Sequence, residues 1–321
     1  MLMYSVKRLL TMVPLLLIIA LLVTAIIDLT PGDPVLLILG ADVAPGQVEE
    51  TRAMLGLDDP FFVRYFRYVT GVLQGDLGTS LITGRPVTAE LFMRFPNTFR
   101  LALISTIAAT LIGIPIGVYA ATKQYTWKDN AAMFLALFFV SMPAFWLALM
   151  LIRLFAVQLR WLPTLGIATW QGWVLPCAVL AVNFAALMAR QMRSNLLEVI
   201  RLDFMTTARS KGLPRRTVLY KHGLKNAIIP IIQVIGNTFV IMLSGSMITE
   251  IIFSIPGVGH YVLTGLRTRD YPIIQGSVMF FAIVTVVVFL LTDIAFASVD
   301  PRIRSQFSRK IKKTGKKVKA A

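Results

Sequence analysis

Long apolar runs constrain the fold of this chain more than any other feature of its sequence. A helix that crosses a bilayer needs about 20 mainly apolar residues, because the hydrocarbon core is about 30 Å thick. Six runs meet or approach this length, at residues 9–27, 101–121, 131–151, 174–189, 227–247 and 277–297. The sequence therefore predicts an all-α polytopic membrane protein with six transmembrane helices.

The composition also favours a membrane location. Of the 321 residues, 56% are hydrophobic and 15% are charged, whereas a soluble domain carries about 25% charged residues. The net charge of +16 lies between the apolar runs and not on a soluble face, so membrane topology explains it better than nucleic-acid binding does. Membrane lipid is thus the expected surrounding, and no nucleic acid is expected as a partner.

Lysine and arginine counts set the predicted orientation, since short cytoplasmic segments retain positive charge. Residues 28–97 carry five basic residues and nine acids, whereas residues 190–226 carry nine basic residues and two acids. The tail after Ala297 carries nine basic residues and one acid. This alternation predicts that both termini are cytoplasmic, that 28–97 is an external loop and that 301–321 is a basic cytoplasmic tail.

The cytoplasmic loop 190–226 has more order than a solvated connector needs. Its apolar residues recur at helical spacing among many charges, and a helix of this kind must bury its apolar face against protein. The stretch 203–211 is predicted to be a short helix, which Gly212 ends in left-handed geometry with Pro214 just beyond. This pattern favours docking on a cytoplasmic partner over a plain solvated loop.

The sequence contains no recognisable motif for enzymatic chemistry. It has no phosphate-binding loop of the form G-x-x-x-x-G-K-[ST], and its two histidines, His222 and His260, lie on opposite predicted sides of the membrane. The single cysteine, Cys177, has no metal-ligand spacing around it. The chain is therefore predicted to have no catalytic residue, no metal site and no cofactor of its own.

Polar residues inside predicted spans are candidates for a translocation path, because such groups are costly in lipid. They are Ser141, Asn183, Asn237 and Ser244. Two interpretations stay open: these side chains line a path, or they only bridge neighbouring helices.

Several motifs resemble those of one transporter family. The cytoplasmic loop reads Asp203-Phe-Met-Thr-Thr-Ala-Arg-Ser-Lys-Gly212-Leu-Pro. Further matches lie at residues 31–34, 55–58, 75–78, 222–230, 249–259, 269–272 and 300–304. The chain thereby resembles the permease subunits of bacterial ABC importers of the dipeptide/oligopeptide/nickel family, and its loop is similar to their coupling (EAA) signature. Thr206 stands where that signature names glutamate, so no carboxylate contact to an ATPase is expected there.

The resemblance implies a type I ABC importer permease in the bacterial inner membrane, with residues 1–300 as the transmembrane permease domain. It implies a second homologous permease, two P-loop ATPases that hold ATP and Mg, and an extracytoplasmic substrate-binding protein as partners. The coupling helix would be residues 196–212. Contacts to an ATPase would come from Leu196, Leu197, Asp203, Phe204, Ala208, Lys211 and Gly212.

The function expected from this resemblance is to form half of the path of an ATP-driven importer of di- and oligopeptides. Import of glutathione, or of nickel and other metal chelates, stays open as an alternative within the family. A different class, an ATP-independent secondary transporter or channel, usually shows internal repeats and ionisable residues at the midplane. The sequence has no clear repeat and no acid at the centre of a span.

Overall fold

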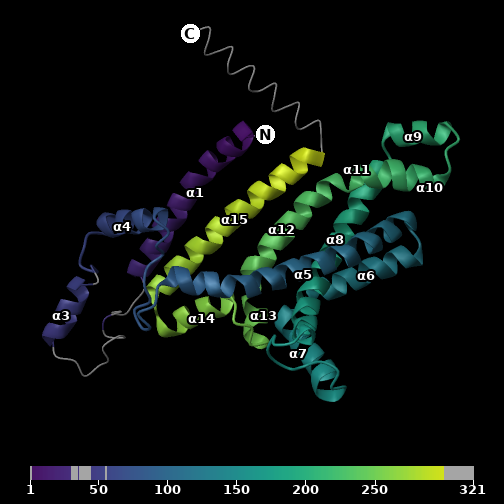
Figure 1. Ribbon diagram of the computed structural model, residues 1–321. Helices are drawn as coiled ribbons and strands as arrows, with labels where there is room; N and C mark the ends of the chain where they lie inside the picture. Colours follow the sequence, from purple (N-terminus) through teal and green to yellow (C-terminus); the bar gives the residue numbers. More distant parts are fainter. Residues whose placement is uncertain (1, 30–34, 36–44, 55, 300–321) are drawn as a thin grey trace, which may run out of the picture. The chain divides into compact units, whose positions relative to one another are not determined.

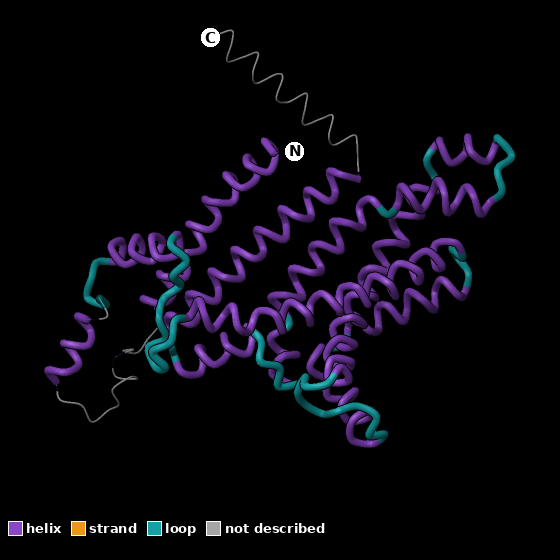
Figure 2. Tube along the Cα trace, viewed as in Figure 1, coloured by secondary structure: helices purple, strands orange, loops and turns teal. Residues whose placement is uncertain are grey.

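The computed structural model describes residues 2–29, 35, 45–54 and 56–299. Within these ranges the chain is helical apart from turns, loops and an isolated bridge between Thr79 and Pro86 (Figures 1 and 2). The all-α prediction is therefore confirmed. The predicted tail 301–321 and the motifs at 31–34 and 300–304 lie outside the described residues.

The first half of the chain contains α1 (Leu2–Leu29), α3 (Pro45–Met54), α4 (Phe61–Leu73), α5 (Val87–Thr122), α6 (Trp127–Ser141), α7 (Ala144–Leu151) and the π-helix η1 (Ile152–Gln158). The second half contains the 3-10 helix η2 (Trp170–Trp173), α8 (Val174–Ile200), α9 (Asp203–Ser210), α10 (Arg215–Thr217), the π-helix η3 (Val218–Leu224), α11 (Lys225–Ala227), α12 (Ile229–Gly245), α13 (Met247–Ile252), α14 (Val258–Thr268) and α15 (Tyr271–Val299).

Four helical segments are long and apolar enough to cross a membrane, and the number rises to six if each of two bent helix pairs is one span. The four segments are Thr11–Leu29, Val87–Thr122, Trp170–Ile200 and Tyr271–Phe296. They coincide with the first, second, fourth and sixth predicted runs. The third run lies within the bent pair Trp127–Ser141 and Ala144–Gln158, and the fifth run matches Ile229–Gly245, the second member of the other pair.

The third predicted run is not one straight helix. α6 and the helical segment Ala144–Gln158 meet at an angle of 98°. Pro143 explains the break, because proline has no backbone N–H to donate and disfavours helical geometry in the residue before it. That residue, Met142, has an extended ψ of 126°.

α5 and α8 both run beyond their predicted spans. α5 has 36 residues, so it is about 54 Å long at 1.5 Å per residue and exceeds the hydrocarbon core. α8 continues to Ile200. It therefore includes Leu196 and Leu197, which the sequence had placed on the coupling helix.

Internal contacts divide the chain into two compact units. The first unit comprises Met1–Val6, Leu101–Met242 and Val288–Ala321, and the second comprises Lys7–Arg100 and Leu243–Val287. Each unit has buried apolar residues of its own.

In the first unit, two glycines allow α5 to lie directly against α8. A Cβ atom at Gly113 would lie 2.5 Å from the carbonyl oxygen of Ala185, and one at Gly117 would lie 2.7 Å from the Cβ of Met192. Small residues of this kind let helix backbones approach closely in membranes. Beside this seam, α5, α8, α11 and α12 share a cluster formed by Val118, Ala121, Met192, Leu196, Ala227 and Ile231.

In the second unit, α1, α4, α5, α14 and α15 share another cluster. Its buried members are Ala20, Tyr65, Leu77, Val87, Leu91, Val258, Tyr261, Ile273, Met279 and Phe280. Two tyrosine hydroxyls add hydrogen bonds to this cluster. Tyr65 donates to the carbonyl of Leu17 at 3.3 Å, and Tyr68 donates to the carbonyl of Gln275 at 3.1 Å. The sequence segment 28–97, predicted to be an external loop, thus builds helices that belong to a packed unit.

Candidate functional site

The short helix α9 is separate from α8 and packs on η3 of the first unit (Figure 1). Its inward face consists of Met205 and Ala208, which pack on Val218 of η3 and on the partly buried Ile200 of α8. The apolar spacing that predicted docking is therefore satisfied in part by the chain itself.

The predicted coupling residues fall into two groups. Leu196 is fully buried and Leu197 is partly buried in the cluster around Met192, and Ala208 is 8% exposed on the inward face of α9. The remaining four, Asp203, Phe204, Lys211 and Gly212, are exposed. The structure leaves these four exposed in α9 and just after its end, and it places the other three against the chain's own helices.

The end of α9 has the geometry predicted from its glycine. Gly212 has φ +74°, in the left-handed region, and its N–H donates to the carbonyl of Arg209 at 2.9 Å. Open space surrounds the position at which a side chain would begin. A left-handed conformation, and not crowding, is thus what requires glycine here.

Apolar side chains reach solvent at both ends of α9. Leu202, Phe204 and Leu213 are 46%, 40% and 37% exposed. Arg201, Arg209 and Lys211 are exposed beside them. This surface combines exposed apolar side chains with basic ones and with the acid Asp203, a mixture that is suited to docking on another protein.

A buried ion pair ties α8 to α6 within the first unit. Asp129 is 1% exposed and accepts two hydrogen bonds from Arg193, from Nε at 2.6 Å and from Nη2 at 2.7 Å. The backbone N–H of Tyr125 donates to the same carboxylate at 3.2 Å. The paired geometry fixes the direction of α8 near the loop that leads to α9.

A hollow of about 460 Å³ with both apolar and polar lining residues opens between α8 and α12 in the first unit. Its lining residues are Phe184, Leu187, Arg190, Gln191, Ser194, Val234, Asn237, Thr238 and Ile241. Asn237 is therefore placed on a surface that can hold water or a polar ligand.

The other candidate path residues are not gathered there. Asn183 lies next to Phe184 on α8 and is half-buried, and Ser141 donates to the carbonyl of Leu137 in its own helix at 2.9 Å. Ser244 belongs to the second unit and is exposed.

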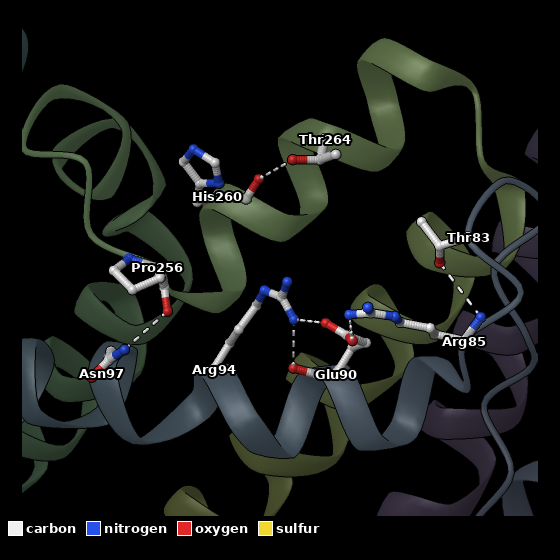
Figure 3. A network of polar contacts seen from close by, with 8 residues as sticks. All are labelled: Thr83, Arg85, Glu90, Arg94, Asn97, Pro256, His260 and Thr264. Atoms are coloured by element: carbon white, nitrogen blue, oxygen red, sulfur yellow. Dashed lines mark hydrogen bonds and ion pairs between the residues drawn. The ribbon is translucent and has the colours of Figure 1, made fainter.

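Figure 3 shows a polar network of the second unit, where α14 lies across the first turns of α5. Glu90 pairs with both Arg85 and Arg94, and the guanidinium of Arg94 lies 4.5 Å from the ring centre of Tyr261. Nearby, the amide of Asn97 donates to the carbonyl of Pro256 at 3.0 Å. This network fixes α14 on α5 by polar as well as apolar contacts.

Next to this network, the carboxylate of Glu250 is completely buried. It accepts hydrogen bonds from Thr98 Oγ1 at 2.7 Å, from Ser246 Oγ at 2.9 Å and from the backbone N–H of His260 at 3.0 Å. The last of these satisfies a free donor in the first turn of α14. Gly257 is needed beside it, since a Cβ atom there would collide with the carboxylate.

Another buried carboxylate, that of Asp270, anchors the turn at residues 80–82. Ser80 Oγ donates to it at 2.6 Å, and the backbone N–H groups of Leu81 and Ile82 donate at 3.3 Å. The sequence reasoning missed Asp129, Glu250 and Asp270 as organising residues. The available signal was an acid shortly before a proline, which occurs at Asp270, where Pro272 follows two residues later.

No group of three or more His, Cys, Asp or Glu side chains that could hold a metal ion occurs among residues 2–29, 35, 45–54 and 56–299. The buried acids just described each sit at a separate place and are occupied by hydrogen bonds from the protein. The arrangement is suited to positioning helices and lining a path.

Family comparisons cover nearly the whole chain. Residues 113–305 match the family described as binding-protein-dependent transport system inner membrane component, and residues 1–102 match the N-terminal family of the same transport systems. The glutathione transport system permease protein GsiC of Salmonella paratyphi A is 42% identical over 95% of this chain and 99% of the relative. GsiC of Pectobacterium atrosepticum is 41% identical and that of Escherichia coli K12 is 38% identical, over the same shares.

Solved structures agree with these matches at the level of the fold. A chain of the MetNI methionine ABC transporter in an inward-facing conformation superposes with a TM-score of 0.58 at 17% identity, over 66% of this chain and 96% of that chain. A second crystal form of the same transporter gives a TM-score of 0.53.

Proposed function

Since this chain belongs to the family of binding-protein-dependent transport system inner membrane components, as an ABC importer permease, we propose that it forms half of an import path for glutathione. The supporting observation is the identity of 38–42% to GsiC permeases over 95% of the chain. Glutathione was an alternative within the family beside the di- and oligopeptides expected from the sequence motifs, and the names of these relatives favour that alternative.

The proposed complex contains a second homologous permease, two ATPases that bind ATP and Mg, and an extracytoplasmic binding protein. In this complex, the exposed surface around Phe204 docks on one ATPase. A docking surface transmits a conformational change only if it contacts the two nucleotide states differently. The inward face of α9, at Met205 and Ala208, then passes the movement to η3 and α8, on which it packs.

The hollow between α8 and α12 is the proposed part of the path in this chain. Its amide and hydroxyl groups at Gln191, Ser194 and Asn237 suit the peptide bonds and carboxylates of a small peptide. Arg190 adds a positive charge at the same hollow, which favours an anionic substrate such as glutathione.

Uptake of radiolabelled glutathione by proteoliposomes tests this function. The complete complex, with binding protein outside and ATP inside, is expected to accumulate glutathione, and a complex with an ATPase that cannot hydrolyse ATP is expected not to. Excess unlabelled glutathione, dipeptide and nickel–histidine are the competitors. Displacement by the chelate and not by glutathione would contradict the proposed substrate, and uptake without ATPase subunits would contradict the transporter class.

A further inference from the structure

A second hollow of the first unit, of about 510 Å³, opens between α5, α6 and α8 and is almost entirely apolar. The hydroxyl of Tyr119 is the polar group among its lining side chains. α5 contributes Ile112, Ile116 and Tyr119, and α6 contributes Ala132, Leu135 and Phe139. A water molecule needs two or more polar partners to occupy such a space. An apolar chain therefore fills this hollow better than water does.

Two exposed lysines lie at one end of this hollow, where a short turn joins α5 to α6 (Figure 1). On α6, Lys128 precedes Ala132 by four residues, and residues four apart share one face of a helix. Lys123 follows Tyr119 by four residues, and its N–H donates to the carbonyl of Tyr119 at 3.2 Å, so the last turn of α5 continues to it. Helical spacing thus places each lysine on the face of its helix that lines the hollow.

The charge at this end of the hollow is positive. Residues 112–139 and 182–197 contain a single acid, Asp129. Its carboxylate is buried and binds Arg193 of α8, so it does not neutralise the two lysines. Trp127 is 74% exposed, and Nζ of Lys128 lies 5.8 Å from the centre of its ring. Tryptophan and lysine at the end of an apolar helix are typical of the boundary between membrane and water.

The depth of the hollow matches one leaflet of a bilayer. Ile112 is 11 residues from Lys123, and Phe139 is 11 residues from Lys128. Each interval is about 16 Å along a helix axis, and half of the hydrocarbon core is about 15 Å thick. A phospholipid whose acyl chain reaches Ile112 and Phe139 therefore has its phosphate at the level of the two lysines.

We propose that this hollow binds one acyl chain of an anionic phospholipid, whose phosphate pairs with Lys123 and Lys128. The lipid belongs to the cytoplasmic leaflet in the predicted topology. A zwitterionic lipid fills the hollow equally well but gains less from the two lysines, because its headgroup carries no net charge. An apolar helix of another subunit gains nothing from them. The inference does not depend on which substrate is transported.

Photocrosslinking of the complete complex tests this site, in liposomes of equal parts phosphatidylglycerol and phosphatidylcholine with the same acyl chains. Tyr119→benzoylphenylalanine places a group that couples to nearby C–H bonds in the hollow, at a position 48% exposed and already aromatic. The matched control is Phe134→benzoylphenylalanine, at an aromatic position of α6 that is 67% exposed and does not line the hollow. Mass spectrometry then gives the ratio of phosphatidylglycerol to phosphatidylcholine adducts. This ratio is expected to be about fivefold or more higher at position 119 than at position 134.

Charge variants show whether the lysines select the lipid. Lys123→Gln/Lys128→Gln is expected to lower the ratio at position 119 to that at position 134. Lys221→Gln/Lys225→Gln removes two exposed lysines of the first unit on the same predicted side, and it is expected to leave the ratio unchanged. Equal ratios at positions 119 and 134, or an equal effect of the two double variants, would overturn the proposal. So would an adduct between position 119 and a peptide of another subunit, because it would identify a protein helix as the occupant.

Discussion

At the scale of single residues, close contacts between helices depend on which positions lack a side chain. Gly117 is such a position, because α8 leaves no room for a Cβ atom there. We predict that Gly117→Val separates α5 from α8 and costs about 1–3 kcal/mol, the usual range for overpacking. A melting temperature of the detergent-purified complex lower by several degrees would be the readout. Gly245→Val is the control, since nothing lies within 4 Å of that position, and an equal loss in both variants would contradict the prediction.

Tyr261 should give the second unit a specific dependence on alkaline pH. Burial, and then the negative charge of Glu90, raise the pKa of Tyr261 to about 12, from about 10 in an unfolded chain. The folded state thus holds the phenolic proton more tightly. Its contribution to stability is complete below pH ~10 and is lost as the pH rises towards 12.

Melting temperatures of the wild type and of Tyr261→Phe, recorded from about pH 8 to pH 11.5, check this expectation. The variant keeps the ring on which Arg94 stacks but has no proton to lose. Its melting temperature should therefore fall less steeply than that of the wild type above about pH 10. Parallel curves would show that Tyr261 does not titrate differently in the two states.

At the scale of elements, the left-handed end of α9 is the feature most open to test. We predict that Gly212→Val reduces glutathione uptake per ATP hydrolysed at least several-fold, because a β-branched residue resists positive φ. Gly212→Asn serves as the control, since asparagine tolerates this conformation. The amount of membrane-inserted protein should not change in either variant. Unchanged coupling in the valine variant would contradict a role for this helix end.

The two faces of α9 should respond differently to substitution. Phe204→Ala removes an exposed apolar group, so ATPase co-purification should weaken while the melting temperature of the isolated permease pair is unchanged. Ala208→Arg forces a charge into the contact with Met205 and Val218, so both quantities should fall. If Phe204→Ala left co-purification intact, the docking surface would have to lie elsewhere.

The sequence predicts the number and positions of the helical runs well, because the apolar length needed in lipid is a local property. It does not predict where α5 begins or where α8 ends, since both helices continue into segments held by tertiary contacts. Pro143 signals a bend, but its angle of 98° depends on what the following helix packs against. Periodicity likewise identified α9, but it did not show that Ala208 faces η3. One face of a short amphipathic helix can pack on its own chain while the other docks on a partner, and periodicity does not say which face does which.

At the scale of the whole molecule, the orientation in the membrane follows from charge counts and is a prediction. In a background with Cys177→Ser, Thr83→Cys should react with an impermeant maleimide in intact spheroplasts. Lys211→Cys should react only after the membrane is opened. Both positions are exposed, so access to the reagent depends on the side of the membrane. The reverse pattern would place α9 outside and exclude contact with a cytoplasmic ATPase.

The close seam of α5 and α8 has a consequence for synthesis of the chain. About 70 residues separate Gly117 from its neighbour Ala189. At a bacterial elongation rate of up to about 20 residues per second, about 4 s or longer pass between the synthesis of Gly117 in α5 and that of Ala189 in α8. During this interval the glycine face is open to any other small-residue helix in the bilayer. Correct assembly of the protein therefore requires that α5 does not pair with another helix before α8 has been synthesised.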